Sequence, residues 1–312
     1  MENSIKVVSI VGPTASGKTK LSVELAKHFN GEIVSADSMQ IYSGMQIATA
    51  KPTKAEMDGV PHHMMGFLPP DKTYSVASYV NDASKCIADI HSRGMLPFIV
   101  GGTGLYVDSL LNNISFSDDK RDEEYCSRLR KIGEEEGADK LLDMLSKFDP
   151  ESAERLRDGK NIKRIIRAIE FYKTTGKTIT EQIKESHNVP SPYSAVKIGL
   201  NCRDRQVLYD RINRRVDIML EEGLLEETQR VINSELSYTS VKAIGYKELI
   251  PYFKENKNLN DCVEKLKMET RRYAKRQITW FKRDTEINWI YIDEYNSFEE
   301  IYSQAKAIIE RG

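Results

Sequence analysis

Short apolar runs, each followed by a helical pattern of apolar and polar residues, alternate along most of the chain. The first run, residues 5–11, precedes a glycine-containing loop and a periodic segment. Further runs occupy residues 32–37, 95–102, 195–202 and 287–293. Nearly continuous apolar strands separated by helices are typical of a parallel sheet that is covered on both faces. The pattern therefore predicts an α/β fold.

The alternation stops between residues 118 and 194, where the chain is charged and shows helical patterns without a strand. This segment predicts a helical insertion domain that leaves the sheet at one strand-to-helix connection. The core domain would then consist of residues 1–117 and 195–312. Helical patterns return over residues 206–284, with a long helix near 260–283.

Overall charge gives little indication of function, but its distribution is more informative. The 312-residue chain has a formal net charge of -1. Eight Lys and Arg residues lie between Arg155 and Lys177, and seven lie between Lys267 and Arg283. Two basic stretches in a nearly neutral protein fit a local polyanion site, and they also fit two solvated helix faces.

Several features indicate a cytoplasmic protein that does not enter a membrane. No apolar run approaches the roughly 20 residues that a membrane-spanning helix needs. The N-terminal residues lack the pattern of a signal peptide. The four cysteines are widely spaced without a C-x-x-C pair, so we expect reduced thiols. A monomer is the default expectation, because nothing in the sequence bears on assembly.

The stretch GPTASGKT, residues 12–19, predicts a phosphate site. Its glycines let successive backbone N–H groups point into one concavity at a helix N-terminus. Lys18 adds positive charge, and the Thr19 hydroxyl can ligate Mg²⁺. Together with the strand before it, the loop predicts a P-loop NTPase-like parallel sheet with helices on both faces. A kinase, an NTPase, and a transferase whose leaving group is diphosphate all fit this cradle.

Three further residues are candidates for the site. Asp37 follows a strand, so it can ligate Mg²⁺, act as a general base or cap the next helix. Thr103 lies in the turn GGTGLY and suits either a ligand contact or a plain turn. For Arg215, helix spacing favours ion pairs with Asp210 and Asp217 over a phosphate contact.

The adjacent residues His62 and His63 would point apart on regular structure, which is poor spacing for a shared metal. We expect them to be loop residues, and the sequence assigns them no role.

The joint set of motifs resembles the tRNA dimethylallyltransferase family over nearly the whole chain. The motifs appear in the family's order as GPTASGKT (12–19), SADSMQIY (35–42), GVPHHM (59–64), YSVASY (74–79), VGGTGLY (100–106), FDPESAERL (148–156), RIIRAIE (164–170), AIGYKEL (243–249) and AKRQITWF (274–281). The resemblance implies transfer of a dimethylallyl group from dimethylallyl diphosphate to the exocyclic N6 amine of the adenosine on the 3′ side of the anticodon. Diphosphate is released.

The resemblance also implies residue roles. Asp37 is the base for the amine proton, Thr103 contacts the reacting end, and Arg215 binds diphosphate, contrary to the ion-pair interpretation. Thr19 holds Mg²⁺. The residues implied to bind diphosphate are Gly12, Thr14, Ala15, Ser16, Gly17, Lys18 and Thr19. Those implied to contact the anticodon stem-loop of tRNA are Asp37, Ser38, Met39, Gln40, Thr103, Lys163, Arg164, Ile165, Ile166 and Arg167. Which tRNAs are modified does not follow from the sequence.

Two other functions share the phosphate loop. An adenylate isopentenyltransferase modifies free adenine nucleotides, and a small-molecule P-loop kinase transfers a phosphoryl group. The insertion and the basic stretch RRYAKRQITWFKR favour a macromolecular acceptor over free nucleotides, whereas a kinase would need an acceptor hydroxyl and an arginine-bearing lid over ATP.

Overall fold

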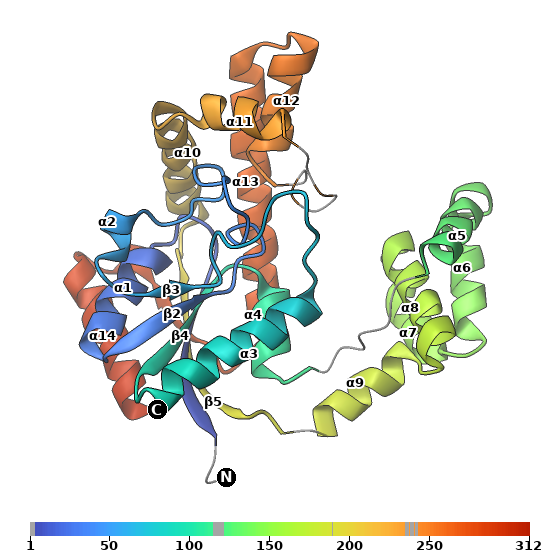
Figure 1. Ribbon diagram of the computed structural model, residues 1–312, viewed down its shortest axis with the longest axis horizontal. Helices are drawn as coiled ribbons and strands as arrows, with labels where there is room; N and C mark the ends of the chain where they lie inside the picture. Colours follow the sequence, from blue (N-terminus) through green and yellow to red (C-terminus); the bar gives the residue numbers. More distant parts are fainter. Residues whose placement is uncertain (1–3, 115–121, 189, 235–236, 238–239, 241–242) are drawn as a thin grey trace. The chain divides into compact units, whose positions relative to one another are not determined.

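The computed structural model describes residues 4–114, 122–188, 190–234, 237, 240 and 243–312. The chain divides into two compact units, one formed by residues 1–111 with 192–312 and the other by residues 112–191 (Figure 1). The insertion limits expected from the sequence were 118 and 194. The first of these lies outside the described residues, and the second falls within a strand of the core that already begins at Tyr193.

The larger unit is built on one sheet of six parallel strands in the order β3-β2-β4-β1-β5-β6 (Figure 1). The strands are β1 (Ile5–Val11), β2 (Gly31–Ser35), β3 (His62–His63), β4 (Leu96–Gly101), β5 (Tyr193–Asn201) and β6 (Asn288–Tyr291). Every neighbouring pair is parallel, which confirms the predicted sheet. The sequence patterns missed β3.

Helices of this unit cover both faces of the sheet, as predicted. The helices of the unit are α1 (Lys18–His28), α2 (Lys54–Met57), α3 (Val76–Ser92), α4 (Gly104–Leu111), α10 (Arg205–Glu221), α11 (Leu224–Ile232), α12 (Tyr246–Glu255), α13 (Leu259–Phe281) and α14 (Phe298–Arg311), with a 3₁₀ turn at Ile292–Glu294. Helices α3 and α4 lie on one face and α1 and α14 on the other, whereas α11 and α12 pack away from the strands. Successive side chains of β1 point to opposite faces of the sheet. Val7 and Val11 belong to one core with α3 and α4, whereas Val8 and Ile10 belong to another with α1 and α14.

The smaller unit consists of helices packed around their own core (Figure 1, green to yellow). They are α5 (Glu123–Glu135), α6 (Gly137–Ser146), α7 (Pro150–Arg157), α8 (Ile162–Thr175) and α9 (Ile179–Asn188). Helix α7 begins in a favourable way, because Asp149 caps it through the N–H of Ser152 and Pro150 occupies its first turn. The unit lies between α4 and β5 in the chain. The chain therefore leaves the core after a helix and not at the strand-to-helix connection expected from the sequence.

None of the described helices combines the length and the apolar character that a membrane span requires.

Candidate functional site

The loop between β1 and α1 adopts a backbone path that requires glycine. Gly12 has a φ of +146°, and a Cβ built on it would lie 2.3 Å from the carbonyl oxygen of Leu200 on the neighbouring strand β5. Gly17, at φ +91°, ends the loop directly before α1. No side chain caps this helix, so its first N–H groups remain available to an anion. The loop therefore has the geometry of the predicted phosphate cradle.

Lys18 turns back over this loop. Its Nζ donates hydrogen bonds to the carbonyl oxygens of Gly12 at 3.0 Å and Pro13 at 2.7 Å. Burial, reinforced by the positive charge of Arg215 and opposed by Asp37, lowers the pKa of Lys18 to about 7. Near neutral pH the Lys18 side chain is therefore only partly protonated. A bound anion would stabilise its charged form.

Two arginines of α10 reach the loop from the other side. Arg211 donates from Nε to the carbonyl oxygen of Ala15 at 2.8 Å, and Arg215 lies 3.5 Å from the Thr14 hydroxyl. Burial is the main cause that lowers the pKa of Arg215 from its ordinary value. The ion-pair interpretation of this residue is wrong for the described structure, where Asp217 pairs with Lys267 at 2.8 Å and Asp210 accepts a hydrogen bond from Gln206 at 2.8 Å.

Asp37 stands just beyond the carboxyl end of β2. Its Oδ1 accepts hydrogen bonds from the N–H groups of Met39 at 2.9 Å and Gln40 at 3.3 Å. The residues that follow form a turn and not a helix, so Asp37 does not cap a helix. Burial raises the pKa of Asp37, although those two hydrogen bonds and the charges of Lys18 and Arg215 act in the opposite direction. A carboxylate with a raised pKa is a better proton acceptor.

Thr103 holds the backbone beside Asp37. Its hydroxyl accepts a hydrogen bond of 3.0 Å from the N–H of Ser38 and lies 3.3 Å from the Ser38 hydroxyl. Its own N–H donates to the carbonyl oxygen of Ala36 at 3.1 Å. These bonds join the turn after β4 to the segment after β2, two neighbouring strands.

A cavity of about 1030 Å³ unites these features. Its lining includes residues 14–20 of the phosphate loop and the start of α1, residues 37–40, and residues 46–53. Arg215 lines it from α10 and Gln277 from α13. Of the site residues predicted in the larger unit, Gly12 and Thr103 are not part of the lining.

Side chains predicted to contact tRNA beside Asp37 are already engaged within the protein. Gln40 accepts from the Ser35 hydroxyl at 3.0 Å and donates to the carbonyl oxygens of Thr49 and Ala50. Met39 packs against the buried cluster that contains Tyr42. Both residues border the cavity, so they shape its wall.

The sequence pointed to no individual residue of α13, yet this helix supplies polar side chains to the cavity. Gln277 is buried and hydrogen-bonded to both Thr14 and Gly102. Burial, with a contribution from the Asp37 charge, raises the pKa of Tyr273, which shares hydrogen bonds with Thr103 and Gln277. Both residues belong to RRYAKRQITWFKR, but the sequence does not reveal which of its polar side chains face inward.

In the smaller unit, helix α8 divides the five predicted tRNA contacts into two groups. Lys163, Arg164 and Arg167 are exposed. Ile165 and Ile166 are at most 2% exposed and belong to the core of the unit. The apolar side chains of Ile165 and Ile166 stabilise the helix packing, so the prediction that these two residues contact tRNA is left with their backbone groups alone.

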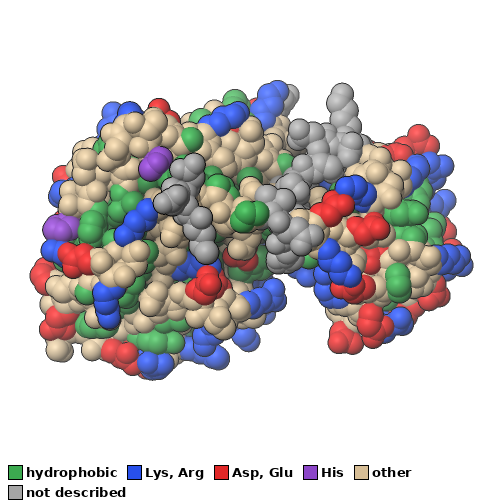
Figure 2. Space-filling model, turned by 90° about the horizontal axis from the view of Figure 1, so that it is seen from below, with side chains coloured by type: hydrophobic (Ala, Val, Ile, Leu, Met, Phe, Trp, Pro, Cys, Tyr) green, Lys and Arg blue, Asp and Glu red, His purple; other side chains and the backbone are tan. Residues whose placement is uncertain are grey.

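Most bases of the stretch 155–177 have carboxylate partners. The pairs are Arg157 with Glu154, Lys160 with Asp139, Arg167 with Glu170, Lys173 with Asp122, and Lys177 with Glu185. Figure 2 shows acidic and basic side chains interspersed on the face that it draws. Lys163 and Arg164 have no carboxylate partner among the described residues, so they are the side chains most available to an external anion.

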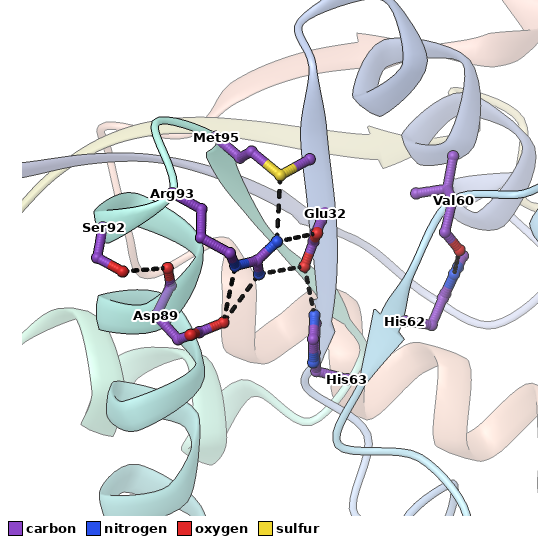
Figure 3. A network of polar contacts seen from close by, with 8 residues as sticks. All are labelled: Glu32, Val60, His62, His63, Asp89, Ser92, Arg93 and Met95. Atoms are coloured by element: carbon purple, nitrogen blue, oxygen red, sulfur yellow. Dashed lines mark hydrogen bonds and ion pairs between the residues drawn. The ribbon is translucent and has the colours of Figure 1, made fainter.

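The two adjacent histidines lie on the edge strand β3, so the loop prediction is wrong, and they point apart as expected (Figure 3). Nε2 of His63 lies 2.7 Å from the carboxylate of Glu32, which Arg93 also binds through two nitrogens at 2.6 and 2.7 Å. The Arg93 guanidinium is the main cause that lowers the pKa of Glu32 to about 2. This network ties β2, β3 and the end of α3 together, which gives His63 a structural role.

His62 turns to the other side. Its Nδ1 bonds with the carbonyl oxygen of Val60 at 2.8 Å, and the residue borders the cavity. In the described part of the chain, no group of three or more His, Cys, Asp and Glu side chains could hold a metal ion.

Comparisons with known proteins agree with this geometry. The family model described as IPP transferase matches residues 40–284, and the one described as isopentenyl transferase matches residues 5–65. The tRNA dimethylallyltransferase of Thermoanaerobacter sp. (strain X514) is 47% identical over 301 residues, which cover 96% of this chain and 95% of that protein. That of Halalkalibacterium halodurans is 49% identical over 285 residues, covering 91% and 90%.

Solved structures give the same result. The tRNA delta(2)-isopentenylpyrophosphate transferase of Staphylococcus epidermidis matches with a TM-score of 0.72 and 44% identity, over 99% of this chain and 100% of that chain. A eukaryotic dimethylallyltransferase acting on tRNA matches with a TM-score of 0.80 and 29% identity, over 99% and 80%. The chain is thus a prenyl transferase that belongs to the tRNA dimethylallyltransferase family.

Proposed function

We propose that this chain transfers a dimethylallyl group from dimethylallyl diphosphate to the N6 amine of the adenosine on the 3′ side of the anticodon in tRNA. Diphosphate is the leaving group. The observation that carries the proposal is the single cavity that holds an anion cradle and the carboxylate of Asp37. Prenyl transfer to an amine needs both, because one stabilises the departing anion and the other accepts a proton.

The donor half of the reaction falls to the phosphate loop. The N–H groups at the start of α1, Lys18 and Arg215 surround the place where diphosphate would lie. Positive charge develops on the allylic carbon as the C–O bond breaks, and negative charge accumulates on diphosphate. Donors fixed in a partly buried site stabilise that negative charge without having to reorganise. The hydroxyl of Ser16, buried and without a partner among the described residues, fits a further bond to an anion oxygen.

The donor set at the cradle also fits Mg²⁺. This ion prefers oxygen ligands, keeps several waters and usually binds through one or two protein groups together with substrate phosphates. The Thr19 hydroxyl lines the cavity at the start of α1 and would hold the ion there. When bound, Mg²⁺ would supply additional positive charge against diphosphate.

The acceptor half falls to Asp37. The lone pair of an adenine amine is delocalised into the ring, so the amine is a weak nucleophile and must lose a proton as the C–N bond forms. Asp37 takes that proton. The backbone bonds from Met39 and Gln40 hold one carboxylate oxygen, and Thr103 fixes the adjoining Ser38. The adenine would have to leave its stack to reach this carboxylate.

Basic side chains would bind the anticodon stem-loop. In the smaller unit, the candidates are Lys163 and Arg164 of α8, which are exposed and have no carboxylate partner among the described residues. Phosphate contacts of this kind position a nucleic acid without reading its sequence. A tRNA substrate supports a cytoplasmic reaction, and a monomer is the expected working form.

One assay separates the proposal from its alternatives. The native chain, Mg²⁺ and labelled dimethylallyl diphosphate are incubated with unmodified tRNA in one reaction and with AMP in another. We expect label in tRNA alone. Label in AMP would favour an adenylate isopentenyltransferase. Hydrolysis of ATP without prenyl transfer would favour a kinase or NTPase, and either result would contradict the proposal.

A further inference from the structure

Gln277 of α13 joins the loops that follow β1 and β4, both of which border the cavity. Its Oε1 accepts a hydrogen bond of 2.9 Å from the N–H of Thr14, and its Nε2 donates one of 2.9 Å to the carbonyl oxygen of Gly102. Thr14 follows β1 and Gly102 follows β4, which are neighbouring strands. One buried carboxamide therefore bridges the two strand ends that border the site.

The bridge requires the chemistry of glutamine. A carboxamide carries a donor NH₂ group and an acceptor oxygen on one head group, and here each bonds to a backbone group of the opposite kind. Methionine has a similar length but can serve neither. The bridge also explains the glycine at position 102, since a Cβ there would lie 2.0 Å from Nε2 of Gln277.

On the donor side, the bridge determines which loop amides an anion can use. The N–H of Thr14 is committed to Gln277, so the phosphate loop offers its amides from Ala15 onward. The backbone of Thr14 is held in place, and its hydroxyl faces Arg215 at 3.5 Å.

On the acceptor side, Gly102 precedes Thr103, whose hydroxyl holds the N–H of Ser38 next to Asp37. Hydrogen bonds of Gln277 and Thr103, joined by the Gly102–Thr103 peptide bond, therefore connect the anion cradle to the segment that carries the base.

Helix α13 is anchored independently of this bridge. Trp280 lies on the same helix face as Gln277, because the two are three residues apart. Its Nε1 donates to Asp108 of α4 at 2.6 Å, and its ring packs on the core of the unit. Substitution of Gln277 should therefore leave the helix in place.

We propose that Gln277 is a positioning residue for prenyl transfer, which sets the distance between the departing diphosphate and the base Asp37. This inference rests on the proposed function. Misplacing reacting groups by about 1 Å can cost about 100-fold in rate. Loss of the bridge should therefore lower kcat much more than it changes the KM of either substrate.

The test compares Gln277→Met with Trp280→Phe, which loses one hydrogen bond on the same helix face. Both variants should show a comparable fall in thermal midpoint. Gln277→Met should lower kcat about 10- to 100-fold with KM values changed less than about threefold, whereas Trp280→Phe should keep kcat within about threefold. A kcat loss for Gln277→Met no greater than that for Trp280→Phe would overturn the proposal.

Gln277→Glu provides a second measurement, the pH dependence of kcat. A purely structural role of Gln277 would leave this dependence unchanged. A protonated glutamic acid can still donate to Gly102 and accept from Thr14, whereas its carboxylate cannot donate. Burial raises the pKa of such a group, so the ratio of variant kcat to native kcat should increase as the pH is lowered. Taking the ratio at each pH removes the titration of Asp37 and Lys18. A ratio independent of pH would contradict the bridge.

Amide hydrogen exchange separates this proposal from the proposed function. The Thr14 amide should be protected in the native chain and should exchange faster in Gln277→Met. Slow exchange in both would refute the bridge even if the native chain prenylates tRNA. Absence of prenylated tRNA from the native chain would instead refute the proposed function and, with it, the positioning role.

Discussion

The hydroxyl of Tyr246 donates a hydrogen bond of 2.8 Å to the carboxylate of Glu227, and both side chains are buried. The same carboxylate accepts from three consecutive backbone N–H groups, those of Gln46, Ile47 and Ala48, at 2.9 to 3.0 Å. These three residues line the cavity. Helices α11 and α12 thus hold a wall of the site through one buried acid.

Glu227→Gln should lower the free energy of unfolding by about 1–3 kcal/mol, because the amide offers one acceptor oxygen where several donors converge. The measurement is urea unfolding. Tyr246→Phe should cost about 1 kcal/mol, and the double variant should show coupling of about 0.5–3 kcal/mol. The exposed neighbour Glu226 gives the control, since Glu226→Gln should change stability by less than about 0.5 kcal/mol. Equal effects at both positions would contradict the anchoring role.

Asp37→Asn tests the base. The amide oxygen can still accept from Met39 and Gln40, so the turn is kept, but proton removal is lost. We expect kcat to fall about 10²- to 10⁴-fold, while the Kd for an anticodon stem-loop changes less than about threefold. Steady-state kinetics and fluorescence anisotropy measure the two quantities. Normal turnover with lost binding would show that Asp37 holds tRNA and removes no proton.

The pH profile of the native chain provides a related measurement. Because burial raises the pKa of Asp37, the residue becomes protonated at a higher pH than an ordinary aspartate. Turnover should therefore be lost on the acidic side as the pH falls through this raised pKa. An acidic limb at the ordinary aspartate pKa would contradict this environment.

Lys18 should couple anion binding to proton uptake. The pKa of about 7 means that the free site loses its ammonium charge above neutral pH, whereas bound diphosphate favours the charged form. Affinity for inorganic diphosphate should therefore weaken as the pH rises above 7. Calorimetry in two buffers with different ionisation enthalpies counts the protons. In Lys18→Arg the guanidinium stays charged, so the extra uptake should disappear. Equal uptake in both proteins would exclude Lys18 as its source.

The pair Lys163 and Arg164 should supply phosphate contacts. In the variant with alanine at both positions, the slope of log K against log salt should flatten by about 1.5, because each lost contact contributes about 0.7–0.9. Arg157 and Lys177 give the matched control, since both already pair with carboxylates. Alanine at these two positions should leave the slope nearly unchanged. An equal change in both variants would favour a diffuse charge effect over a defined contact.

Features encoded within a few neighbouring residues could be predicted from the sequence. The phosphate loop follows from its own glycines, and the parallel sheet follows from the apolar runs. The role of Gln277 could not be predicted, because it depends on contacts with Thr14 and Gly102, which are far away in the sequence. The two-residue strand β3 is too short to produce a pattern. Ile165 and Ile166 lie in the stretch that the resemblance assigns to tRNA contact, yet their side chains belong to the core of the helical unit, which the motif alone does not reveal.

The place of the helical unit between α4 and β5 has a consequence for synthesis of the chain. Strand β1 pairs with β5 along its whole length, from Ile5 opposite Tyr193 to Val11 opposite Gly199. A ribosome must therefore complete residues 112–191 before β1 can gain its second neighbour. The helical unit, whose contacts are local, can fold at once, while the sheet keeps an open edge until β5 emerges. Nascent chains of this length would be the ones most in need of protection by a chaperone.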